Sequence, residues 1–203
     1  MTSYRKRPTE SGTAIRNILD KLNKKRLQTY AELAQVGATS AILKQLADDG
    51  MITAVGSGIY ASAKLDPFIA AVLATARYYP NAVISAHTAL QIHGLGDEYI
   101  SKVDVDISRD TSIRNRTLNV HRVSNNRLVG ITSMVFHREK IRIYDLERSL
   151  CEAYLLDPKG AIFFKALKRY CAGGKIDSEA IVRYDRDLKT QVLTHLRQEL
   201  ASG

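Results

Sequence analysis

A closely spaced series of helix and turn signals in the first 50 residues constrains the fold more than any other feature of the sequence. Apolar residues at positions i, i+3, i+4 and i+7 predict an amphipathic helix over residues 11–25. These residues are Ile15, Ile18, Leu19 and Leu22. Thr29 is placed to cap a short second helix over residues 30–35, and Gly37 then turns the chain.

A third helix and a hairpin are predicted next. Thr39 or Ser40 can cap a helix that ends at Gly50, a residue type typical of helix C-termini. Residues 51–61 contain two short apolar segments on either side of a glycine-rich tip at residues 56–58. This pattern predicts a β-hairpin.

The order of helix, short helix, turn, helix and hairpin predicts a winged helix-turn-helix domain over residues 1–62. Such a domain fits double-stranded DNA, because one helix can enter the major groove and the hairpin, or wing, can lie against the backbone. Charge supports this prediction, since residues 1–26 hold eight bases and only two acids. The candidate DNA-binding residues are Arg5, Lys6, Arg7, Thr39, Ser40, Lys44, Gln45 and Ser57.

Several of these candidates have a plainer alternative. Thr39 or Ser40 could act only as a helix cap, and the basic arm at residues 5–7 could be a solvated tail. The wing tip at residues 56–58 carries no Lys or Arg, so its backbone N–H groups are the means of reaching a phosphate there.

The rest of the chain, residues 63–203, is predicted to form an α+β domain with a mainly antiparallel sheet and flanking helices. Pro67 follows a small, polar segment and marks the start of this domain. Strand signals gather in the middle and helix signals lie at both ends, as in α+β folds. The expected strands cover residues 82–84, 103–107, 118–123, 131–137 and 140–144. The expected helices begin at Asp66, Ser85 and Asp145 and cover residues 161–170, 178–184 and 187–200.

Composition bounds the setting in which the protein works. The longest apolar run is far below the roughly 20 residues that a membrane-spanning helix requires. The polar N-terminus lacks the apolar segment of a secretory signal. Cys151 and Cys171 are too few for a disulfide framework. We therefore expect a cytoplasmic protein with no membrane partner, and its net charge of +9 favours a polyanionic one.

Asp104 and Asp106 are the pair that most resembles a catalytic motif. Two carboxylates at i and i+2 share one face of a strand, where they can hold Mg²⁺. Nucleotidyltransferases place such a pair after a turn of small residues that cradles phosphate, but here Asp97 follows Gly96 and would repel phosphate. We interpret the pair as the solvent-exposed face of a strand, with metal binding or pairing with the nearby arginine stretch as the alternatives. We expect no catalytic residue, no metal and no cofactor.

Three motifs in a fixed order carry a family resemblance. They are LADDGMITAVGSGIYA at residues 46–61, AVISAHTALQIHGL at 82–95 and IRIYDLERSLCEAY at 141–154. By these motifs the chain resembles the AbiEi-type antitoxins of type IV toxin–antitoxin systems. The resemblance implies a DNA-binding antitoxin that is not an enzyme. Its winged helix would repress its own operon, and its C-terminal domain would neutralise an AbiEii-like, nucleotidyltransferase-like toxin, with or without a stable complex, in defence against phage.

A second basic stretch offers a surface that could contact an acidic toxin, the toxin's nucleic-acid substrate or DNA. The candidate residues are Arg109, Arg114, Arg116, Arg122, Arg127, Lys140 and Arg142. A solvated sheet face is the plainer interpretation of the same residues. Two rival functions stay open: a metal-dependent nucleotidyltransferase or nuclease that uses Asp104 and Asp106, and a transcription factor whose C-terminal domain senses a ligand.

Overall fold

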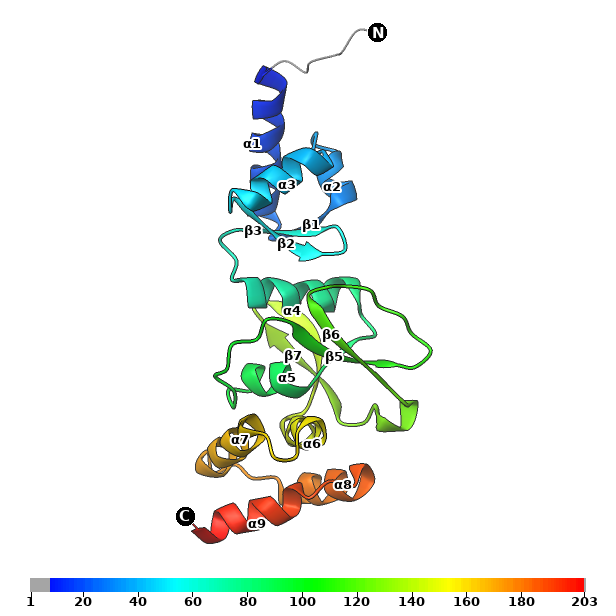
Figure 1. Cartoon of the computed structure of the whole chain (residues 1–203), viewed down its shortest axis with the longest axis vertical. Coiled ribbons are helices and arrows are strands. Elements are labelled where there is room, and N and C mark those ends of the chain that lie inside the picture. The colour runs from blue at the N-terminus through cyan, green and yellow to red at the C-terminus, as the bar shows by residue number, and fades with distance from the viewer. Residues whose placement is uncertain (1–7, 203) are drawn as a thin grey trace. The chain divides into compact units, whose positions relative to one another are not determined.

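The computed structural model describes residues 8–202, and its fold is α+β (Figure 1). The chain divides into two compact units. Unit 1 comprises the chain up to Ala74 together with Asn115–Thr117, and unit 2 comprises residues 75–114 and the chain from Leu118 onward. The predicted domain boundary after residue 62 stays a prediction. The arm residues Arg5, Lys6 and Arg7 lie outside the described residues.

Unit 1 contains helices and a small antiparallel sheet. Its elements are α1 (Pro8–Lys24), β1 (Leu27–Thr29), α2 (Tyr30–Ala34), α3 (Ser40–Asp48), β2 (Ile52–Gly56) and β3 (Ile59–Ser62). The strand order is β1-β3-β2. The helices and the hairpin agree with the sequence prediction, whereas β1 was not predicted. This strand has three residues, which are too few to establish a period of two.

Apolar side chains at helical spacing build the core of unit 1. The buried members are Ile18, Leu22, Leu33, Ala38, Leu43, Leu46 and Ile52. Caps fix where the short helices begin. The Thr29 side chain accepts the Glu32 N–H and the Glu32 carboxylate accepts the Thr29 N–H, which together form a capping box. Thr39 caps α3 by accepting the Ile42 N–H over 3.2 Å.

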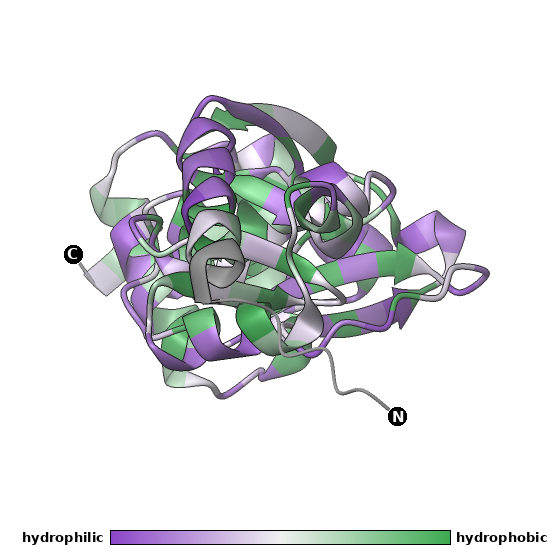
Figure 2. Cartoon of the chain, turned by 90° about the horizontal axis from the view of Figure 1, so that it is seen from above, coloured by the Kyte–Doolittle hydropathy of each residue, from purple (hydrophilic) through white to green (hydrophobic). Residues whose placement is uncertain are grey.

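Unit 2 contains a five-stranded sheet, a helix that packs on this sheet, and a group of helices that follows the last strand in the chain. Helix α4 (Pro67–Tyr78) begins in unit 1 and ends in unit 2. The following elements are β4 (Val83–Ile84), α5 (Ala86–Ile92), β5 (Val103–Ser108), β6 (Leu118–Val123), β7 (Ile131–Phe136) and β8 (Glu139–Tyr144). Hydrophobic and hydrophilic segments alternate along the ribbons (Figure 2).

The sheet of unit 2 is mixed, so the prediction of a mainly antiparallel sheet is wrong here. The strand order is β6-β5-β4-β8-β7. The pairs β5–β6 and β4–β8 are parallel, whereas β4–β5 and β7–β8 are antiparallel. Residues 109–117 carry the chain back before β6 begins, so β5 and β6 run in the same direction. A longer connection of this kind permits parallel neighbours, which a tight hairpin does not.

Four further helices complete unit 2 and share a core with α5. They are α6 (Leu146–Leu156), α7 (Ala161–Ala172), α8 (Ser178–Leu188) and α9 (Val192–Ser202). Among their buried residues are Leu150, Phe163, Leu167, Ile181 and Leu196. The predicted helix start at residue 187 is wrong. Helix α8 continues to Leu188, and Lys189, in the left-handed conformation at φ 57°, then ends it.

Candidate nucleic-acid interface and buried polar network

Helix α3 presents a row of polar side chains opposite its apolar face. Leu43 and Leu46 are buried, while Ser40, Lys44 and Gln45 are exposed. Because residues four apart lie above one another on a helix, Ser40 and Lys44 belong to one exposed stripe. Three of the predicted DNA-binding residues therefore lie on the accessible side of one helix.

Thr39 and Ser40 have different surroundings, although the sequence left both open as caps. The Thr39 hydroxyl is occupied by the helix N-terminus, where it accepts the Ile42 N–H. Ser40 is the first residue of α3 and is exposed. Of the two hydroxyls, the one of Ser40 is thus placed to contact a partner.

The β2–β3 hairpin turns through left-handed backbone at its tip. Gly56, Ser57 and Gly58 have φ values of +90°, +51° and +70°. Ser57 is exposed at the tip of this hairpin. Glycine tolerates this backbone without the steric cost that a Cβ brings, which explains two of the three residue types.

The predicted basic surface is spread over separate elements. Arg109, Arg122, Lys140 and Arg142 are exposed in unit 2, and Arg114 is exposed as well. Arg122 lies on β6 at one edge of the sheet, whereas Lys140 and Arg142 lie on β8, with β5 and β4 in between. Arg116 belongs to unit 1. The structure therefore does not gather these residues into a single cluster.

Arg127 differs from the other members of that set. It is half-buried, and its Nη2 lies 4.0 Å from Oε2 of Glu152. Its carbonyl oxygen accepts a hydrogen bond from Arg148 over 3.2 Å. These contacts assign Arg127 to an internal polar network rather than to an open surface.

Asp104 and Asp106 are buried, so their prediction as a solvent-exposed face is wrong. Their exposed fractions are 5% and 0%. Strand β5 is flanked by β4 and β6, and α5 packs on the face that carries both carboxylates. Alternation along the sequence could not reveal this, because a central strand covered on both faces buries both of its rows.

Hydrogen bonds satisfy the carboxylate of Asp104. Its Oδ1 accepts Nδ2 of Asn119 over 2.8 Å and faces Nε2 of His121 at 3.4 Å, while the Thr88 hydroxyl donates to Oδ2. Burial acts to raise the pKa of Asp104, but the bonds from His121 and Asn119 outweigh it and hold this pKa below its usual value. In turn, Asp104 raises the pKa of His121.

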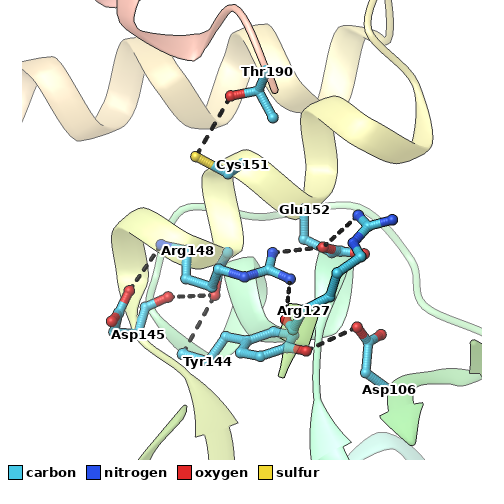
Figure 3. A network of polar contacts seen from close by, with 9 residues as sticks. Asp106, Arg127, Tyr144, Asp145, Arg148, Cys151, Glu152 and Thr190 are labelled. Atoms are coloured by element: carbon cyan, nitrogen blue, oxygen red, sulfur yellow. Dashed lines mark hydrogen bonds and ion pairs between the residues drawn. The ribbon is translucent and has the colours of Figure 1, made fainter. Parts of the chain in front are cut away.

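Asp106 lies deeper and behaves differently. The Tyr144 hydroxyl donates to its Oδ2 over 3.0 Å (Figure 3). Burial is the main cause that raises the pKa of Asp106, and the negative charge of Glu152 adds to it. The two carboxylates of one strand are therefore held in opposite ways, one towards the ionised form and the other towards the neutral form.

Arg148 and Glu152 complete the network on α6, and neither was among the predicted site residues. Arg148 is fully buried, and its Nη1 donates to Oε2 of Glu152 over 2.5 Å. Its guanidinium lies 4.2 Å from the centre of the Tyr144 ring. Figure 3 shows Asp106, Tyr144 and Arg148 converging below α6. The spacing i, i+4 of Arg148 and Glu152 was the available signal, but on its own it also describes any exposed helix pair.

The sequence Tyr-Asp-Leu-Glu-Arg at residues 144–148, within the third family motif, thereby acquires a structural explanation. Asp145 caps α6 by accepting the Arg148 N–H over 2.8 Å. Glu147 accepts the Tyr170 hydroxyl over 2.8 Å. Every polar residue of this segment makes an internal contact, so the segment fixes where α6 begins after β8.

Two features are absent from the described part of the chain. Within residues 8–202, no group of three or more His, Cys, Asp or Glu is arranged to hold a metal ion. In the same range, no helix is long and apolar enough to cross a membrane.

Comparison with known proteins identifies a similar fold but no family. No protein-family model matches the chain. No curated protein sequence matches it either. A solved structure, the crystal structure of the RV2827C protein from Mycobacterium tuberculosis, is similar with a TM-score of 0.64 and 14% sequence identity. The match covers 96% of this chain and 78% of that one. At this identity the similarity bears on the fold alone.

Proposed function

We propose that residues 1–62 form a winged helix-turn-helix that binds double-stranded DNA at the promoter of the protein's own operon and represses it. The observation that carries this proposal is the exposed polar row of α3, formed by Ser40, Lys44 and Gln45. A helix fits the major groove, and hydroxyl and amide side chains can contact base edges while a lysine binds phosphate. The hairpin that follows α3 corresponds to the wing.

Charge favours a polyanionic partner for this part of the chain. Lys24, Lys25 and Arg26 are exposed at the end of α1, as is Lys44 on α3. Exposed bases contribute little to stability, but they attract phosphates over several ångströms. This distribution is the one that a DNA-binding unit needs.

For the C-terminal part we propose the second task of an AbiEi-type antitoxin in the cytoplasm, which is to neutralise a nucleotidyltransferase-like toxin without itself being an enzyme. The sequence motifs that resemble this family support the proposal. The exposed bases Arg109, Arg122, Lys140 and Arg142 are its candidate surface. Asp104 and Asp106 have a structural role in this proposal, since both are buried and hydrogen-bonded to neighbouring side chains.

DNA binding is tested by titrating the full-length protein against its promoter and a random duplex at several salt concentrations. We expect preference for the promoter and a steep loss of affinity with salt, because phosphate contacts release counterions. Lys44→Ala should weaken binding to both duplexes. Ser40→Ala and Gln45→Ala should alter base preference by about 1–3 kcal/mol. Equal affinity for the promoter and the random duplex would overturn the repressor proposal.

The two tasks are separated in cells that carry an inducible toxin and a promoter reporter. Lys44→Glu should relieve repression and still rescue growth. Arg122→Glu combined with Arg142→Glu should reduce rescue and leave repression intact, because reversed charges repel an acidic partner. Asp104→Asn with Asp106→Asn should retain rescue if the protein stays folded by thermal melt. Loss of rescue in that folded variant would favour an enzyme instead.

A further inference from the structure

The hairpin of unit 1 has a second segment packed against it. Residues Asn115–Thr117 lie far from the hairpin in sequence but belong to the same compact unit. The Thr117 hydroxyl lies 2.8 Å from the backbone carbonyl oxygen of Val55 on β2, within hydrogen-bonding distance. At the next residue, Gly56, an added Cβ would lie 2.2 Å from Oδ1 of Asn115. The missing side chain at Gly56 is what permits this close approach.

The same segment folds into a tight turn around Arg116. Oδ1 of Asn115 accepts the backbone N–H of Thr117 over 2.9 Å, which is the hydrogen bond of an Asx-turn. Arg116 is the central residue of this turn and is exposed. Its Cα lies about 3.8 Å from that of each neighbour. Because Thr117 and Asn115 both lie against the hairpin, the backbone of Arg116 is held beside it.

We propose that Arg116 is the phosphate-binding residue of the wing, an inference that rests on the proposed DNA binding. The tip itself, Gly56-Ser57-Gly58, has no basic side chain. Arginine is always charged, and its planar guanidinium binds phosphate oxygens in a bidentate manner. The Asx-turn and the Val55 contact already hold the backbone of Arg116 in place. Binding DNA therefore costs less conformational entropy at Arg116 than it would for a residue in a free loop. Arg116 thus belongs to the DNA interface rather than to the toxin-facing surface.

The test compares two charge reversals in the full-length protein. Arg116→Glu should lower affinity for the promoter duplex by about tenfold at 0.1 M salt, because one phosphate contact is lost and one repulsion is gained. Arg197→Glu, on the exposed side of α9, makes the same change in net charge and should alter affinity less than about twofold. Arg116→Gln should reduce the salt slope by about one. Equal affinities for Arg116→Glu and Arg197→Glu would overturn the inference.

A second variant tests the anchoring. Thr117→Val removes the hydroxyl that faces Val55, so it should weaken binding as well. Since both changes act through the same phosphate contact, the double variant Arg116→Gln with Thr117→Val should lower the affinity for the promoter duplex no more than Arg116→Gln alone. Full additivity would contradict the anchoring. If the wild-type protein shows no preference for its promoter, the proposed function fails. If Lys44→Ala weakens binding and Arg116→Glu does not, this inference alone fails.

Discussion

Polar side chains share one face of α3 and one face of β5, but the two faces lie in opposite surroundings. Ser40 and Lys44 are exposed on α3, whereas Asp104 and Asp106 are buried on β5. A helix on the surface of a small unit buries one stripe and leaves the other open. A strand in the middle of a covered sheet has no open face. The α3 row is therefore available to a partner, while the β5 row must find its partners inside the protein.

This difference determines what each row contributes to the free energy of unfolding. Exposed charges such as Lys44 contribute a few tenths of a kcal/mol. The buried charges around β5, such as Arg148 and Glu152 on α6, contribute little as a pair, but removal of one partner lowers the free energy of unfolding strongly. Mutations on α3 should therefore change binding and leave stability nearly unchanged, whereas mutations around β5 should change stability.

The largest expected effect is the removal of Arg148. Arg148→Met leaves Glu152 buried without its 2.5 Å partner and should cost about 3–5 kcal/mol of unfolding free energy in a denaturant titration. The double variant Arg148→Met with Glu152→Leu should recover much of this loss, because neither charge is then unpaired. Arg197→Ala is the exposed control, expected within about 0.5 kcal/mol of the wild type. A loss below 1 kcal/mol for Arg148→Met would contradict the burial argument.

The next largest effect is a pH dependence at His121. The folded protein raises the pKa of His121 above its ordinary 6.5 and lowers the pKa of Asp104 below its ordinary 3.8. The stability that comes from the raised pKa of His121 is complete below about pH 6.5 and is lost as the pH rises through the higher pKa of the folded state. The stability that comes from the lowered pKa of Asp104 is complete above about pH 3.8 and is lost as the pH falls through the lower pKa of the folded state. The pair should therefore stabilise most between roughly pH 4 and 6.5.

His121→Gln measures this contribution. The free energy of unfolding of this variant should be lower than that of the wild type by on the order of 1.5 kcal/mol at pH 5, and by less at pH 8. The reason is that a hydrogen bond between charged groups stabilises more than one between neutral groups. Denaturant titrations at both values give the two deficits. A deficit that is equal at pH 5 and pH 8 would show that His121 is not protonated against Asp104.

Sequence patterns predicted the local structure better than the buried chemistry. The caps at Thr39 and Asp145 were predictable because the capping side chain and the backbone N–H that donates to it are three residues apart. The burial of Asp104 was not, because it depends on residues of β6 and α5 that are 15 and 16 positions away, beyond the reach of a local pattern. Contacts such as that between Thr117 and Val55 join residues more than 60 positions apart, and no local period indicates them.

Thr39 and Ser40 sharpen the comparison within α3 itself. Thr39→Ala removes the acceptor of the Ile42 N–H and should cost about 1 kcal/mol of unfolding free energy. Ser40→Ala should leave stability within about 0.5 kcal/mol and act on DNA preference instead. Thermal melts paired with binding curves separate the two outcomes. A destabilising Ser40→Ala would indicate that its hydroxyl also serves the helix.

The smallest expected effect, a gain in stability, lies in the second hairpin. The turn between β7 and β8 consists of His137 and Arg138, with φ values of +47° and +73°. Two left-handed residues in a two-residue turn define a type I′ geometry, which favours Asn-Gly. The β2–β3 tip uses glycine at two of its left-handed positions, whereas this turn uses none.

Replacing the pair tests whether exposed polar residues of unit 2 are dispensable for folding. His137→Asn with Arg138→Gly should stabilise by about 0.5–1 kcal/mol, because relief of the left-handed strain exceeds the entropy that glycine adds to the unfolded chain. Both residues are exposed, and the packing lost is the edge contact of the His137 ring with the Phe136 ring, whose centroids lie 4.6 Å apart. Denaturant titration gives the difference directly, with His137→Asn alone as the intermediate case. A net loss of stability would mean that the Arg138 side chain makes a contribution larger than the strain, and exposure would then be a poor guide to energetic cost in this part of the sheet.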